Sequence, residues 1–133
     1  MKIRSFCLIL LFVLSACNLG TSDVTPIPTP DIPIVEILAP ENNQQVFEDT
    51  DFDFDIVARD STSGIALVEL YVDEIVINFS SPIEDASVPV FRTTMNWRAV
   101  GVGRHIVEVI AYRADGQQSD PARITIEVLA RDE

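Results

Sequence analysis

From residue 34 to residue 129 the chain is a series of short runs in which apolar residues recur at every second position. Gly, Pro, Asn, Asp and Ser separate these runs, and no segment has sustained helical periodicity. A repeat of two residues is typical of strands that bury one face, and turns about 8 to 12 residues apart are typical of a sandwich. The pattern therefore predicts an all-β, antiparallel β-sandwich of about seven to eight strands. The predicted strands are residues 34–39, 46–48, 51–59, 65–72, 75–80, 90–97, 105–113 and 122–129.

The alternation is clearest in residues 51–59. Apolar side chains occupy the even positions and aspartates occupy the first three odd positions, so only one face can turn to the core. The same reasoning places Trp97 inside, as the largest candidate for the centre of the core. The predicted inward residues are Phe52, Phe54, Ile56, Ala58, Val68, Leu70, Val72, Phe91, Thr93, Met95, Trp97, Val107, Val109, Ala111, Ile124, Ile126 and Val128.

The first 16 residues differ from the rest of the chain. Lys2 and Arg4 precede an apolar stretch, residues 6–14, and the small residues Ser15 and Ala16 follow it. This order is typical of a secretory signal, and the stretch is too short to span a bilayer. We therefore predict that residues 1–16 form an export signal that is removed.

The signal ends in the run Leu14-Ser15-Ala16-Cys17. This run resembles the lipobox of bacterial lipoproteins, which implies that Cys17 is cut free at its amino side and carries covalent lipid such as palmitate. Two acyl chains at ~0.8 kcal/mol per buried methylene give a gross anchoring energy above ~20 kcal/mol. The alternative is an ordinary cleaved signal in which Cys17 is incidental. Asn18 stands where an inner-membrane lipoprotein of proteobacteria usually has Asp, which favours an outer membrane or the cell surface.

The exported chain can form no internal disulfide, because Cys7 leaves with the signal and Cys17 is consumed by lipid. Its stability must come from a packed core, and residues 17–133 have the length of a single domain. Loss of Lys2 and Arg4 changes the net charge from −12 to −14. Such a charge repels nucleic acid and anionic lipid headgroups, so we expect neither as a partner.

A linker joins Cys17 to the predicted sandwich. Residues 18–33 read NLGTSDVTPIPTPDIP, and the prolines disfavour helix and remove backbone donors. Extended at about 3.1 Å per residue, this linker could hold the domain up to ~50 Å from a bilayer. The predicted organisation is a signal peptide at 1–16, a lipidated cysteine and Thr/Pro-rich tether at 17–32, a sandwich domain at 33–130 and a tail at 131–133.

Several short motifs along residues 33–129 share the order found in one known family. They are IVEILAPEN at 34–42, ARD at 58–60, SGIALVELYVD at 63–73, Trp97, GRH at 103–105, AY at 111–112 and ADG at 114–116. Together they resemble the bacterial immunoglobulin-like (Big-type) domains of secreted and surface proteins. The resemblance implies an immunoglobulin-like sandwich.

Two positions depart from that family's pattern. Glu74 stands where Gly commonly follows the Asp of a hairpin, which disfavours a two-residue type I′ turn because that turn requires positive φ. Arg113 stands where an Asp commonly precedes the last turn, so a side-chain cap there must come from elsewhere, such as Asp115. We expect the fold to survive both changes.

Acidic residues gather along the strand predicted at residues 51–59. Calcium binds several carboxylate oxygens at about 2.3 to 2.6 Å, so Asp51, Asp53 and Asp55 are a weak calcium candidate. Alternate residues on a strand lie about 6.7 Å apart, however, and the Gly and distal Glu of a calcium loop are missing. The preferred interpretation is a solvated, edge-protecting acidic face, and no metal is predicted.

No group of residues predicts catalysis. His105 is the only histidine and cannot by itself complete a nucleophilic triad or a zinc site, so we predict that it packs against the core. Residues 101–103, Gly-Val-Gly, precede a strand rather than a helix and so predict a turn, not a phosphate loop. Asp60 is expected to bond backbone amides in the loop that follows it. We therefore predict a non-enzyme with no cofactor besides the lipid on Cys17.

A candidate interaction face lies opposite the core on two strands. If those strands are neighbours, as in immunoglobulin-like sandwiches, Glu69, Tyr71, Ile106, Ile110 and Tyr112 face outward together. Aromatic and aliphatic groups with charge at their rim are typical of interfaces. The alternative is that Tyr71 and Ile110 only pair across the sheet, at about 0.2 to 1 kcal/mol per pair.

These observations predict a lipid-anchored, extracytoplasmic immunoglobulin-like module for adhesion or protein interaction at the bacterial cell envelope. The alternative is a carbohydrate-binding accessory module, because related domains often accompany polysaccharide-degrading enzymes. A sugar site needs exposed aromatic platforms, which Tyr71, Tyr112 and, more distantly, Phe79 could provide. The sequence does not identify the protein or glycan partner.

Overall fold

The computed structural model describes residues 31–83 and 86–131, and every named element in them is a β-strand. The predicted all-β class is confirmed, with strands close to the predicted positions. The eight strands are β1 (Ile34–Ala39), β2 (Gln44–Phe47), β3 (Asp51–Arg59), β4 (Leu67–Val72), β5 (Ile75–Ser80), β6 (Val90–Arg98), β7 (Gly103–Tyr112) and β8 (Ala122–Leu129).

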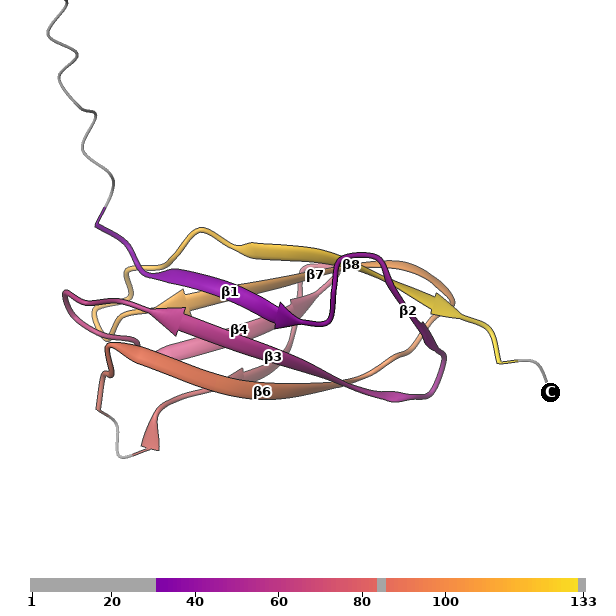
Figure 1. Ribbon diagram of the computed structural model, residues 1–133, viewed down its shortest axis with the longest axis horizontal. Helices are drawn as coiled ribbons and strands as arrows, with labels where there is room; N and C mark the ends of the chain where they lie inside the picture. The colour runs from indigo at the N-terminus through magenta and orange to yellow at the C-terminus, as the bar shows by residue number, and fades with distance from the viewer. Residues whose placement is uncertain (1–30, 84–85, 132–133) are drawn as a thin grey trace, which may run out of the picture.

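The strands form two layers that pack face to face (Figure 1). One sheet has three strands in the order β1-β3-β6, and the other has five in the order β2-β8-β7-β4-β5. Alternation sets the register, because buried Phe54 of β3 lies opposite buried Met95 of β6, and exposed Asp53 lies opposite exposed Asn96. The aspartates of β3 therefore face away from the core, as predicted.

The β2–β8 pair is parallel, which differs from the predicted antiparallel arrangement. After β1 the chain crosses to the other sheet, where the backbone of Thr125 bonds to Asn42 Oδ1 and to Asn43 N–H, both at 2.8 Å. These bonds set Gln44 beside Ile126, so β2 begins two residues earlier than predicted. No hairpin reverses the chain between β1 and β2, and β2 therefore meets β8 in the parallel sense.

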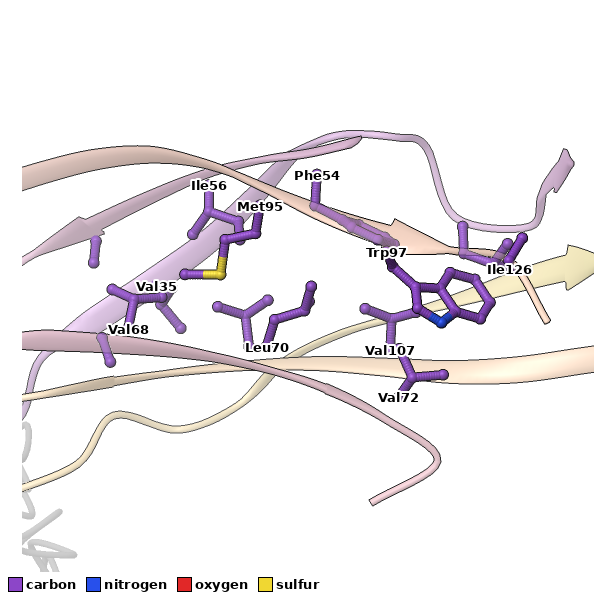
Figure 2. Close-up of a cluster of buried hydrophobic side chains, with 14 of the residues drawn as sticks. Val35, Phe54, Ile56, Val68, Leu70, Val72, Met95, Trp97, Val107 and Ile126 are labelled. Atoms are coloured by element: carbon purple, nitrogen blue, oxygen red, sulfur yellow. The ribbon is translucent and has the colours of Figure 1, made fainter. Parts of the chain in front are cut away.

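The core between the sheets contains most of the predicted inward side chains (Figure 2). Trp97 is buried, with 4% of its surface exposed, but it lies beside Ile126 toward one end of the core rather than at its centre. Its place in the strand explains this, because Trp97 is the next-to-last residue of β6. Phe52 and Phe91, each second in its strand, are only partly buried, as is Ile124.

β1 begins at one end of the sandwich and β8 finishes at the other (Figure 1). The end where β1 begins also carries the connections β3–β4, β5–β6 and β7–β8. Among residues 31–83 and 86–131, no helix is long and apolar enough to cross a bilayer. The predicted signal, Cys17 and most of the predicted tether lie outside the described residues.

Candidate functional site

The outer face of the five-stranded sheet collects the residues predicted to form an interaction face. β4 and β7 are hydrogen-bonded neighbours, with Glu69 opposite Ile110 and Leu67 opposite Tyr112. The residues between them, such as Leu70 and Val109, point into the core. The structure therefore brings together on one surface, which we call the outer patch, Glu69, Tyr71, Ile106, Ile110 and Tyr112.

The two tyrosines of the outer patch are joined through their hydroxyls. Tyr71 donates to Glu69 Oε2 at 2.6 Å, and the hydroxyls of Tyr71 and Tyr112 lie 3.3 Å apart. Because Tyr71 gives its proton to Glu69, Tyr112 is the donor to Tyr71. The hydrogen bond to Glu69 raises the pKa of Tyr71 well above its ordinary value of 10.0, and burial raises the pKa of Tyr112. Both phenols therefore stay neutral at physiological pH.

Apolar side chains and one ion pair lie on the same sheet face as this hydroxyl chain. Ile106 is 50% exposed, and Phe79 of β5, which lies opposite Glu69, is also exposed. Arg123 donates through Nε to Glu108 Oε1 at 2.7 Å. An apolar centre with a charged rim is typical of protein–protein interfaces. A surface depression of about 450 Å³ adjoins the patch and is lined by Asp73, Glu74, Ile106, Glu108 and Arg123.

A buried ion pair lies at the end of the sandwich where β1 begins. Arg113 donates to both carboxylate oxygens of Asp60, at 2.6 and 3.0 Å, and to Asp31 at 2.9 Å. Asp60 also accepts from the N–H groups of Thr62 and Ser63, which confirms the predicted turn. The hydrogen bond from Arg113 lowers the pKa of Asp60 to about 2. Asp31, the first described residue, is thereby held to the domain.

Sequence reasoning missed the Arg113–Asp60 pair. One signal was available, since Arg113 lies two residues beyond inward-facing Ala111, where a buried charge requires a partner. The partner is 53 residues away, and no local pattern points to it. The prediction that Asp115 supplies the turn cap is confirmed, because its Oδ1 accepts from Gln117 N–H at 2.9 Å.

His105 packs against the core, as predicted. Its ring meets Trp97 edge to face, with the centroids 5.4 Å apart. Nδ1 lies 2.7 Å from Asp73 Oδ2 and Nε2 lies 2.6 Å from the carbonyl oxygen of Gly101, so both ring nitrogens are engaged. Burial opposes ionisation of Asp73, but hydrogen bonds from the Ile106 N–H and from His105 lower its pKa below the ordinary value.

Those bonds also hold the β4–β5 hairpin. Asp73 and Glu74 form its turn, with φ values of 50° and 68°. The sequence placed this turn in doubt, because Glu74 replaces a Gly that would adopt positive φ without strain. The two contacts from Asp73 to β7 compensate the strain and keep a two-residue turn.

The acidic row on β3 bonds to its neighbour strand. Asp53 Oδ1 accepts from Asn96 at 2.9 Å, and Asp55 Oδ1 accepts from Thr94 at 2.8 Å. In the part of the chain that the structure describes, no three His, Cys, Asp or Glu side chains converge as metal ligands. Asp51, Asp53 and Asp55 are thus spread along a solvated sheet surface.

Solved structures with this architecture come from several bacterial proteins. The fibronectin(III)-like modules of CbhA from Clostridium thermocellum are 28% identical, with a TM-score of 0.63 and coverage of 74% of this chain and 100% of that one. The SrpA adhesin from Streptococcus sanguinis is 13% identical, with a TM-score of 0.53 and coverage of 77% and 58%. The endo-β-1,4-mannanase from Thermotoga petrophila is 9% identical, with a TM-score of 0.54 and coverage of 74% and 20%. The last two show a likeness of fold alone.

Sequence comparison gives the family. No curated protein matches the chain. The profile of the bacterial Ig domain matches residues 33–109, which is more than half of the chain and includes β1 through most of β7. Together with the two-layered sandwich, this match shows that the chain belongs to the bacterial Ig domain family.

Proposed function

We propose that this chain is an extracytoplasmic interaction module, held to a bacterial envelope by lipid, that binds a protein through the outer patch. The observation that carries the proposal is the patch itself, where the hydroxyls of Tyr71 and Tyr112 meet on a sheet face that also carries exposed Ile106. The fold likeness to a streptococcal adhesin supports a surface role. The likeness to modules of CbhA supports a role as an accessory domain.

The anchoring part of the proposal depends on the run Leu14-Ser15-Ala16-Cys17. Lipid on Cys17 would restrict the domain to a membrane surface, and the linker would give it a reach of up to ~50 Å. The net charge of −14 left after signal removal would keep the domain away from an anionic bilayer and free to meet a partner.

The chemistry of the outer patch favours a protein over a glycan. Sugars need free hydrogen-bonding groups around an aromatic platform. The hydroxyls of Tyr71 and Tyr112, by contrast, already hydrogen-bond to each other, and that of Tyr71 also bonds to Glu69. The half-buried rings of the two tyrosines and the aliphatic Ile106 and Ile110 suit an apolar contact. The second candidate remains a carbohydrate-binding accessory role, favoured by the position of Phe79 next to Glu69.

We also propose that the domain has no catalytic role. His105 is the only histidine of the chain, and both of its ring nitrogens are bonded within the domain. Among the described residues no nucleophile lies beside it, because its partners are a carboxylate and a backbone carbonyl. The hydrogen bonds of His105 to Asp73 and Gly101 therefore stabilise the β4–β5 hairpin and leave no ring nitrogen for a reaction.

The decisive experiment is partner capture by the lipidated full chain from native membranes. The parent protein is compared with the double variant Tyr71→Ser, Tyr112→Ser and with a control, Thr94→Ser, on the opposite sheet. Loss of the captured protein in the tyrosine variant alone supports the outer patch. Capture that is equal for all three proteins overturns it, and binding on a glycan array that needs the tyrosines supports the second candidate.

A further inference from the structure

The single histidine of the chain connects two turns of the sandwich. Its Nδ1 lies 2.7 Å from Asp73 Oδ2, in the turn of the β4–β5 hairpin. Its Nε2 lies 2.6 Å from the carbonyl oxygen of Gly101, in the turn between β6 and β7. We call His105 with these two hydrogen bonds the histidine clamp. The clamp ties the hairpin of one sheet to the turn that enters from the other sheet.

The partners of the ring determine how many protons it carries. A carbonyl oxygen can only accept a hydrogen bond, so Nε2 must donate to Gly101. Asp73 also accepts from the Ile106 N–H at 2.9 Å. Burial opposes ionisation of Asp73, but its two hydrogen bonds keep its pKa below the ordinary value, so the group is a carboxylate. A carboxylate also only accepts, and Nδ1 must therefore donate as well. A ring that donates from both nitrogens is the imidazolium cation.

A neutral ring cannot keep both bonds. Neutral imidazole has one N–H, so the loss of a proton leaves a nitrogen lone pair pointing at an oxygen of Asp73 or of Gly101. Two acceptors repel each other at such short distances, and one of the two turns must then move away. Histidine side chains change charge between about pH 5 and pH 8. We propose that the histidine clamp is a pH-operated device, closed when His105 carries two ring protons and open when it carries one.

The environment of the ring makes its charge dependent on Asp73. The side chain of His105 is only 15% exposed, its ring meets Trp97 edge to face, and β8 places apolar Ile126 opposite it. A poorly hydrated cation needs a bonded counter-charge, and in the described part of the chain Asp73 is the charged side chain that bonds to the ring. The charged groups on the elements around the ring are Asp73 and Glu74 of the hairpin turn, Glu48 of the β2–β3 connection, Arg98 of β6, Arg104 of β7 and Glu127 of β8.

The clamp also sets the shape of the depression beside the outer patch. Asp73 and Glu74 line this depression together with Ile106 of β7. Both turn residues have positive φ, and the contacts from Asp73 to β7 compensate the strain. Opening of the clamp removes one of those contacts or frees the Gly101 turn. Regulation of binding by pH rests on the proposed function of the outer patch, whereas the clamp itself does not.

The test uses Trp97, which is the only tryptophan of the chain and lies 5.4 Å from the His105 ring, centroid to centroid. Protonated imidazole quenches the fluorescence of a touching indole strongly, and neutral imidazole quenches it weakly. Emission of the full chain in a mild detergent is followed from about pH 5 to about pH 8, with circular dichroism in parallel. We expect emission to rise with pH. The hydrogen-exchange protection of the Ile106 amide should fall at least about fivefold over the same transition.

The decisive variant is Asp73→Asn. Its side-chain carbonyl can still accept from the Ile106 N–H, but its amide N–H faces Nδ1, and only a neutral ring can accept there. We expect the fluorescence transition to move to lower pH by about one unit. The matched control is Asp55→Asn, which changes an aspartate that accepts one hydrogen bond from Thr94 on the other sheet. Its transition should coincide with that of the parent.

A second measurement needs no variant. Nitrogen-15 NMR of the only histidine should show two protonated ring nitrogens at the acid end of the range and one at the alkaline end. A ring whose protonation does not change across the range overturns the proposal, as does a folded Asp73→Asn protein whose transition coincides with the parent's. No partner is present in either measurement. The variant Tyr71→Ser, Tyr112→Ser should keep the transition, so failure of the outer patch and failure of the clamp are distinguishable.

Discussion

Both tyrosines of the chain belong to the outer patch, so a tyrosine titration reports directly on the candidate site. The perturbation is Glu69→Gln, which replaces the charged acceptor of the Tyr71 hydroxyl by a neutral amide. A hydrogen bond to a charged group contributes about 1.5 to 3 kcal/mol and one between neutral groups about 0.5 to 1.5 kcal/mol. The loss of about 1 kcal/mol corresponds to a fall in the Tyr71 pKa of about 0.7 unit.

The assay is the near-ultraviolet absorbance of tyrosinate as pH is raised, with circular dichroism in parallel to show where the fold persists. In the parent, the folded-state pKa values of both tyrosines are raised above 10.0. Their contribution to stability is therefore complete below about pH 10 and is lost as pH rises further. In the Glu69→Gln variant we expect Tyr71 to ionise at a lower pH than in the parent. The free energy of unfolding of this variant should also depend less on pH in the alkaline range.

The matched control is Glu127→Gln. Glu127 is also half-buried, on β8, but it accepts a hydrogen bond from Gln45 and not from a tyrosine. Its titration curve should coincide with that of the parent. The reasoning is refuted if the folded parent ionises both tyrosines near pH 10, or if the Glu69→Gln curve overlays the parent curve.

Three further outcomes follow from the structure. Trp97→Ala should lower the free energy of unfolding by about 3 to 5 kcal/mol in urea, while exposed Phe47→Ala should stay within about 0.5 kcal/mol; equal effects would contradict the core placement. The folded-state pKa of Asp60, about 2 against an ordinary 3.8, means that its stabilisation holds above pH 4 and is lost as pH falls toward 2. Asp60→Asn should remove that part of the acid dependence of urea midpoints, and an unchanged dependence would count against the ion pair. Cys17→Ala should abolish incorporation of radiolabelled palmitate and release the domain from membranes; labelling that persists would disprove the lipid site.

The sequence predicted most of the strands because their apolar residues alternate with polar ones. It also predicted that the β4 and β7 residues of the outer patch would meet if those strands were neighbours, since neighbouring strands place residues of the same phase on one face. Strand β2 was less well placed because Gln44 and Gln45 are both polar and carry no alternation. Its parallel partner β8 is set by contacts from Asn42 and Asn43, which lie 83 and 82 residues away from Thr125, respectively.

Two features of the surface and the interior were beyond local patterns. The run of Ile75, Val76 and Ile77 has no alternation, so nothing in it tells an exposed edge strand from a buried one. Its exposure follows from the strand order and the narrower opposite sheet. The ion pair of Arg113 with Asp60 depends on where two connections meet in space, and a charge at an inward position reveals only that some partner must exist.

The parallel β2–β8 pair determines how the domain resists pulling. A load between the two ends of the sandwich draws β2 toward the start of the chain and β8 toward its finish, so the two strands are dragged past each other in opposite directions. Their interstrand bonds are then strained together and must rupture almost simultaneously, whereas strands peeled apart from one end lose their bonds one at a time. A domain that is pulled by these two ends would therefore keep its fold until the β2–β8 hydrogen bonds ruptured.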